Sequence, residues 1–124
     1  MPAWLGKDEV IHFHRLLIAE YGGLEGPPDL NALESTLDRP KNRLRYDPSI
    51  SLAGLAASYG FGFVRNHCFP DGNKRIALVC IDVFLQINGY ELVAGEVDAA
   101  HTLWQVAAGA MSEEELAAWI AANL

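Results

Sequence analysis

The sequence has few of the features that mark secreted, disulfide-rich or membrane-spanning proteins. It contains only two cysteines, Cys68 and Cys80, which are too few for a disulfide framework and have no metal-type spacing. Its longest apolar stretches are interrupted by charged or polar residues or glycines, well short of a membrane span. No basic segment followed by an apolar run stands near Met1, so we expect no signal peptide. These features favour a reducing, cytoplasmic setting and no membrane partner.

Positive charge is also scarce. Nine lysines and arginines face sixteen aspartates and glutamates, which gives a formal net charge of −7. Because a general nucleic-acid-binding protein needs a basic face, we expect no direct contact with nucleic acid. A small anion such as ATP is not excluded, since Lys74 and Arg75 make one stretch locally basic.

What the sequence does contain is typical of one globular domain over residues 1–124. It is 51% hydrophobic and 20% charged. Apolar periodicity and capping residues predict a series of helices, the second of them short because Pro40 should end it. The predicted helices are Lys7–Tyr21, Leu30–Asp38, residues 51–66, Lys74–Asn88, Val97–Met111 and Ser112–Leu124. The fourth is apolar on nearly every side, as a central bundle helix would be.

The most distinctive stretch lies between two of these helices, at residues 67–75 (HCFPDGNKR). Pro70 and Gly72 make a continuous helix through it improbable, so we expect a loop. Asn73 to Arg75 then fall at a helix start, where unpaired N–H groups and a positive dipole end suit an anion such as phosphate.

The pattern His-x-Phe-x-Asp-Gly-Asn-Lys-Arg resembles the signature of the Fic/Doc superfamily, and the lysine after the asparagine is similar to its Doc (death-on-curing) branch. The resemblance extends in order over roughly residues 7 to 93, through Tyr21–Gly26 and Phe84–Tyr90. It implies a compact all-α Fic/Doc bundle of about six helices around a buried central helix that follows the motif loop. It also implies a bacterial or phage-encoded protein.

Roles for the motif residues follow from their chemistry and from the resemblance. His67 is the expected general base, because histidine takes up protons near neutral pH; the alternative is a histidine that only packs at a helix end. Asp71 is the expected Mg²⁺ ligand, since Mg²⁺ is usually held by one or two carboxylates plus phosphates and waters. The alternative, a helix N-cap, is compatible with metal binding.

Gly72 and Asn73 are expected to form an anion cradle, although ordinary turn chemistry would explain them too. Lys74 and Arg75 should neutralise charge on a transferred group, and the alternative is a solvated pair. Phe69 is expected to pack inward as a structural anchor. The remaining histidines lack partners at ligand spacing and are interpreted as ordinary helix residues: His12, His14 and His101.

Two departures from the broader Fic pattern favour kinase chemistry. Lys74 replaces a glycine and Leu78 replaces an arginine, which fits the Doc arrangement, in which ATP binds inverted and its γ-phosphate is transferred. The resemblance implies a toxin that phosphorylates a Thr or Ser hydroxyl, by analogy on elongation factor Tu, and so inhibits translation. The Fic inhibitory pattern is absent, so a separate antitoxin chain should inhibit it in trans. The alternatives are AMPylation or other nucleotidyl transfer, or a catalytically silent binding module.

Residues 40–50 show little periodicity. Composition favours a solvated connector, whereas the resemblance suggests a flap that positions a partner protein beside the active site.

Overall fold

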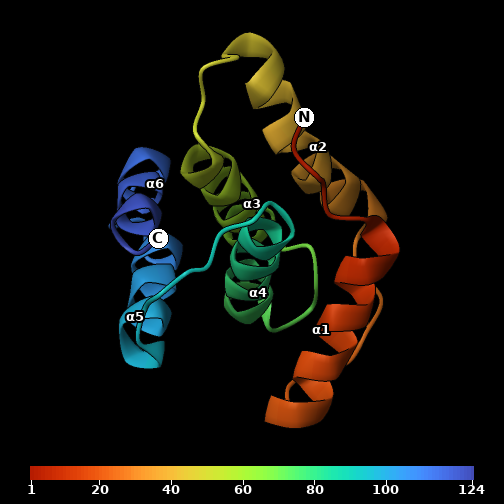
Figure 1. Ribbon diagram of the computed structural model, residues 1–124. Helices are drawn as coiled ribbons and strands as arrows, with labels where there is room; N and C mark the ends of the chain where they lie inside the picture. Colours follow the sequence, from red (N-terminus) through yellow and green to blue (C-terminus); the bar gives the residue numbers. More distant parts are fainter.

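The computed structural model describes all 124 residues and contains six α-helices and no strand (Figure 1). The helices are α1 Lys7–Tyr21, α2 Leu30–Tyr46, α3 Leu52–Asn66, α4 Asn73–Ile87, α5 Glu96–Ala107 and α6 Glu113–Ala122. The prediction of an all-α bundle of about six helices is therefore confirmed. None of the helices has the length and apolar character that crossing a membrane requires.

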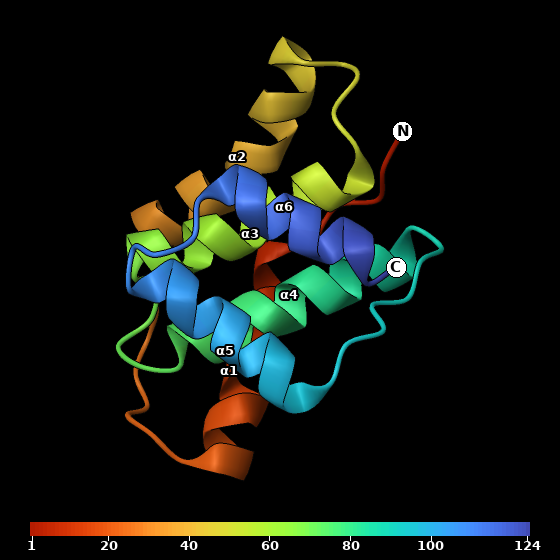
Figure 2. The ribbon, with the colours of Figure 1, turned by 90° about the vertical axis from the view of Figure 1, so that its left-hand side faces the viewer.

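The core is built around the pair α3 and α4. Helix α4 contacts α1, α3 and α5, which confirms its predicted central place (Figure 2). Helix α3 is buried even more completely: eleven of its fifteen residues are buried, compared with seven of the fifteen in α4. Its small residues make this possible. A Cβ atom added to Gly60 would lie 2.5 Å from Cδ1 of Ile81, so the missing side chain lets α3 and α4 approach closely.

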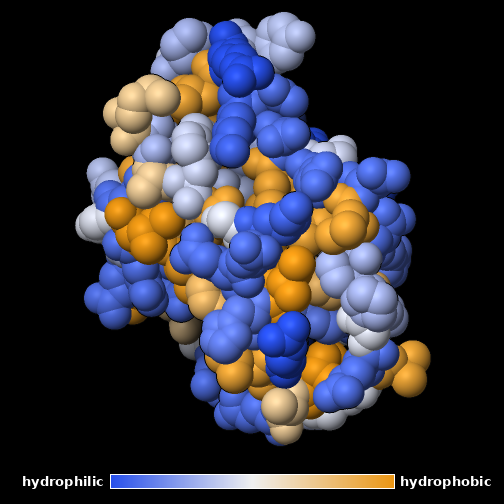
Figure 3. All heavy atoms as spheres, turned by 90° about the vertical axis from the view of Figure 1, so that its right-hand side faces the viewer, coloured by the Kyte–Doolittle hydropathy of each residue, from blue (hydrophilic) through white to orange (hydrophobic).

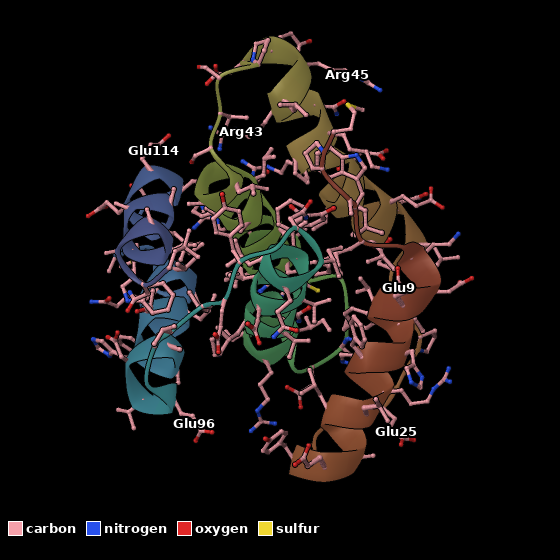
Figure 4. The ribbon with its side chains drawn as sticks, in the orientation of Figure 1. Glu9, Glu25, Arg43, Arg45, Glu96 and Glu114 are labelled. Carbon is pink, nitrogen blue, oxygen red and sulfur yellow. The ribbon has the colours of Figure 1, made fainter.

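Helix α2 is longer than predicted. It does not stop before Pro40 but continues to Tyr46, with Pro40 buried inside it. Proline removes one backbone hydrogen bond, and tertiary contacts offset that loss. Arg39 and Arg43 both form ion pairs with the buried carboxylate of Glu113, at the start of α6. Figure 4 shows Arg43 in the upper part of the molecule, where α2 lies across from α6.

Residues 40–50 do not form a flap beside the motif, which was one of the two interpretations that the sequence left open. This segment holds the second half of α2 and a turn, and it projects at the end of the molecule where α3 begins (Figures 1 and 2). The motif follows the other end of α3, about 22 Å away at 1.5 Å per helical residue. Residues 22–29 lie against the motif instead, since the N–H of Asp29 donates to the carbonyl of Cys68 at 2.8 Å.

The helix predicted over Val97–Met111 ends earlier, at Ala107. Gly109 follows with a φ of 76°, a left-handed conformation that glycine adopts without strain and that turns the chain towards α6.

Candidate active site

The motif forms the loop that joins the end of α3 to the start of α4 (Figure 1). His67 caps α3 with φ 45° and ψ 60°, and it is the only non-glycine residue of the chain with a positive φ. Such a conformation costs energy for a residue with a side chain, and strained residues of this kind cluster at functional sites. The side chain of His67 is exposed, in contrast to the buried residues that follow it.

Asn73 holds the shape of this loop from within. Its side-chain oxygen accepts a hydrogen bond from the N–H of Phe69 at 3.0 Å, and its side-chain nitrogen donates to the carbonyl of Phe69 at 2.8 Å. The same nitrogen lies 3.4 Å from Nδ1 of His67. Because the amide is committed to these contacts, Asn73 can offer an anion only its main-chain N–H.

The start of α4 presents a set of unpaired donors. The first hydrogen bond of the helix runs from the N–H of Ile76 to the carbonyl of Gly72, at 2.9 Å. The N–H groups of Asn73, Lys74 and Arg75 have no protein acceptor. Gly72 precedes them with a φ of 78°, which a residue with a side chain would adopt only with strain. Together these features give the start of α4 the geometry that the predicted anion cradle requires.

Asp71 is held by main-chain donors on both carboxylate oxygens. Oδ1 accepts from the N–H of Gly72 at 2.8 Å, and Oδ2 accepts from the N–H of Leu24 at 3.1 Å. These two bonds, with smaller contributions from Arg75 and His14, lower the pKa of the Asp71 carboxyl. The N-cap of α4 is Gly72, so the interpretation of Asp71 as the helix cap is wrong.

These side chains surround one cavity of about 700 Å³. Its lining comprises Tyr21, Gly22, Gly23, Val64, Arg65, His67, Pro70, Asp71, Gly72, Asn73, Lys74, Arg75 and Ala107. All the predicted site residues are therefore brought together except Phe69, which is buried, as an anchor should be. A cavity of this size is in the range of small-molecule sites.

Two large side chains that line the cavity, those of Tyr21 and Arg65, had no predicted role. Tyr21 lies at the end of α1, and its ring centre is 4.9 Å from the guanidinium carbon of Arg75. Arg65 lies in the last turn of α3, where it stacks over Phe61 at 5.5 Å. Such cation–π contacts orient a guanidinium without neutralising its charge. In the sequence, only the proximity of Arg65 to His67 indicated that its side chain lines the cavity.

His14 is a helix residue, as predicted, but its side chain also reaches the motif loop, which the sequence did not indicate. Its side chain is only 4% exposed, and its Nε2 lies 2.7 Å from the main-chain carbonyl oxygen of Asp71. Its ring stacks on Phe69, with centroids 3.8 Å apart and planes 11° apart. Its sequence position could have indicated this burial, because His14 is spaced four residues from both Val10 and Ile18, the other buried residues of α1.

The chain presents no group of three or more His, Cys, Asp or Glu side chains that could hold a metal ion. The donor set instead matches the way Mg²⁺ is usually bound together with a nucleotide. An exposed, ionised carboxylate at Asp71 stands beside an anion cradle, and each of its oxygens retains lone pairs beyond its single backbone bond.

Comparison with known proteins gives a consistent picture. Residues 4–85 match the model of the Fic/DOC family. The chain is 34% identical over 88 residues to "Protein kinase doc" of Escherichia phage P1, covering 71% of this chain and 70% of that protein. It is 34% identical over 105 residues to "Toxin Doc" of Mycolicibacterium smegmatis, covering 83% of this chain and 78% of that protein.

Proposed function

The chain belongs to the Fic/DOC family, and from that premise we propose that it is a Doc-type toxin kinase. It transfers the γ-phosphate of ATP to a Thr or Ser hydroxyl of a target protein. The observation that carries this proposal is the convergence on one cavity of an exposed histidine, an ionised carboxylate, three unpaired N–H groups and two cations. The printed names of the two relatives, a protein kinase and a toxin, support the same activity.

In the transfer step, His67 is the proton acceptor. The target hydroxyl oxygen forms a bond to the γ-phosphorus, the bond from that phosphorus to the β–γ bridging oxygen breaks, and ADP leaves. The hydroxyl proton passes to the imidazole of His67, whose exposed position allows a protein substrate to approach. Asn73 lies 3.4 Å from the ring and helps to orient it.

The start of α4 stabilises the negative charge of the phosphates. The N–H groups of Asn73, Lys74 and Arg75 and the two cationic side chains form a positive end against which phosphate oxygens would lie. Asp71 would hold Mg²⁺, which would neutralise part of the negative charge on the phosphates.

Two residues of α4 favour γ-phosphoryl transfer over nucleotidyl transfer. The side chain of Lys74 occupies the place where the Fic pattern has a glycine for close phosphate approach, and Leu78 supplies no charge where that pattern has an arginine. By resemblance to the Doc branch, the target is elongation factor Tu, and an antitoxin chain inhibits the enzyme in trans.

Label transfer tests this function. The protein is incubated with bacterial lysate or purified elongation factor Tu and either γ-labelled or α-labelled ATP, with and without Mg²⁺. We expect the γ-label alone to reach protein, and only with Mg²⁺. Efficient transfer of the α-label would instead identify a nucleotidyl transferase, and transfer of neither label would contradict an ATP-dependent activity.

Lys74→Gly sharpens the distinction between the two reactions. The variant removes a cation near the transferred phosphate and should lower the rate of γ-label transfer, since a charge-assisted contact contributes roughly 1.5 to 3 kcal/mol. It also restores Gly-x-Gly around Asn73, so a trace of α-label transfer is expected. Unchanged γ-label transfer by the variant would show that Lys74 has no part in the step.

A further inference from the structure

We propose that His14 is a positioning residue for the reaction: it sets the placement of the Asp71 carboxylate through the main-chain carbonyl of Asp71. The catalytic part of this inference rests on the proposed function. The geometric part does not, because it concerns contacts within the chain.

His14 is a polar side chain buried where an apolar one would be expected. It lies between Val10 and Ile18 on the buried row of α1, and its side chain is 4% exposed. The outer face of α1 and α2, by contrast, is largely covered by hydrophilic side chains (Figure 3). A buried polar group costs free energy unless it is hydrogen-bonded, and the carbonyl oxygen of Asp71, 2.7 Å from Nε2, provides that partner.

The contacts of His14 cover the first part of the motif loop. Its ring stacks flat on Phe69 at 3.8 Å, and its Nε2 bonds to Asp71. A Cβ atom built on Gly72 would lie 3.5 Å from the same Nε2. One side chain of α1 therefore contacts Phe69 and Asp71 and leaves only van der Waals space beside Gly72, so the loop cannot shift far without breaking one of these contacts.

These contacts restrain Asp71 at three separate oxygen atoms. The main-chain oxygen bonds to His14, Oδ1 accepts from the N–H of Gly72, and Oδ2 accepts from the N–H of Leu24. The last two bonds fix the side-chain rotamer only while the main chain of Asp71 keeps its orientation. The bond from His14 is the one that fixes that orientation from outside the loop.

The substitutions His14→Phe and His14→Gln separate this role from simple packing. Phenylalanine keeps an aromatic ring stacked on Phe69 but cannot donate a hydrogen bond to Asp71. Glutamine loses the ring, but its amide nitrogen can reach the position of Nε2 and restore the donor. His12→Gln is the matched control, because His12 lies on the same helix with an exposed side chain.

The first readout is amide hydrogen exchange of Gly72 and Leu24, measured without nucleotide. We expect exchange at both amides to be about tenfold faster in His14→Phe, the scale of one lost hydrogen bond, and close to wild type in His14→Gln and His12→Gln. Wild-type exchange in His14→Phe would overturn the inference.

The second readout is the Mg²⁺ concentration that gives half-maximal γ-label transfer. It should rise about tenfold in His14→Phe and return towards the wild-type value in His14→Gln, whereas the pH dependence of the rate should not change, because His67 is intact. An equal loss in both variants would reduce His14 to a packing residue and contradict the inference. If the wild type transfers no label, the proposed function fails, and the exchange experiment still tests the contact itself.

Discussion

The pair of helices α3 and α4 has two contrasting regions: a tightly packed middle, and the end where the motif loop joins the two helices. In the middle, Gly60 allows the two helices to approach until Cδ1 of Ile81 fills the space of a side chain, and Tyr59 and Phe84 are fully buried beside them. At the joined ends, the chain is exposed at His67, adopts a strained φ there, and leaves three N–H groups without acceptors.

This contrast indicates how stability and chemistry are divided. The packed middle buries large apolar side chains, and that burial favours folding. The loop has a strained residue at His67, and the helix start that follows it has unpaired N–H groups that a ligand can occupy. Substitutions in the loop should therefore affect activity with little change in stability, and substitutions in the middle should do the reverse.

The largest effect is expected at the exposed end of the pair. His67→Ala should lower γ-label transfer by about 10²- to 10⁴-fold, because the proton of the target hydroxyl loses its acceptor. His67→Asn should show the same loss, although asparagine tolerates a positive φ, so the loss is not due to backbone strain. Both variants should unfold at nearly the wild-type denaturant concentration. Near-normal transfer by either variant would remove His67 from the mechanism.

The next effect concerns the carboxylate of the loop. Asp71→Asn keeps an oxygen that accepts one of the two backbone bonds but removes the charge, so Mg²⁺-dependent ATP binding should weaken roughly tenfold to hundredfold. Calorimetric titration of ATP with and without Mg²⁺ measures this change. Glu25→Gln removes an exposed charge from the neighbouring loop and serves as the control. An equal Mg²⁺ requirement in all three proteins would contradict the metal role of Asp71.

In the packed middle the expected change is in stability alone. Gly60→Ala places a methyl group 2.5 Å from Cδ1 of Ile81 and should lower the free energy of unfolding by about 1 to 3 kcal/mol. Adding Ile81→Val removes the Cδ1 atom, so the double variant should be more stable than the sum of the two single changes predicts. If the changes in the free energy of unfolding of the two single variants simply add in the double variant, Gly60 is not needed for the close approach of Ile81.

The smallest effect depends on pH. Burial raises the pKa of Tyr59 to about 12, and its hydroxyl oxygen accepts the N–H of Leu5 at 3.2 Å. The folded state therefore favours the neutral phenol, whereas the unfolded phenol ionises near its ordinary pKa of about 10. Stability from this difference is complete below pH 10 and is lost as the pH rises towards 12.

In Tyr59→Phe, the free energy of unfolding should therefore decrease less as the pH rises above 10. The difference in pH dependence between the two proteins should be about 1 kcal/mol by pH 11, read from urea unfolding curves at pH 8 and pH 11. Parallel curves for the two proteins would show that Tyr59 is not protected from ionisation.

The sequence predicted the elements whose cause is local. The bounds of α1, the loop at Pro70 and Gly72, and the start of α4 directly after that loop all follow from neighbouring residues. It failed where a distant contact decides the outcome. Helix α2 passes through Pro40, and the arginines on either side of that proline pair with Glu113, far along the chain.

The same limit applies to the candidate site. The motif gave the residues that face the cavity, but not the side chains that hold the motif in place. His14 and the N–H of Leu24 reach Asp71 from α1 and from the segment after it, and their role appears only once these segments are folded against the loop. The spacing of residues within the motif does not indicate which distant groups will bond to it.

The central claim is that phosphates bind at the start of α4, at the exposed end of the pair, and not elsewhere on the molecule. A titration of the ¹⁵N-labelled protein with Mg²⁺ and ATP, followed by amide chemical shifts, tests it directly. We predict the largest shifts at the N–H groups of Asn73, Lys74 and Arg75, with little change at Gly60. Shifts that leave those three amides unmoved, or that centre on another part of the chain, would contradict the claim.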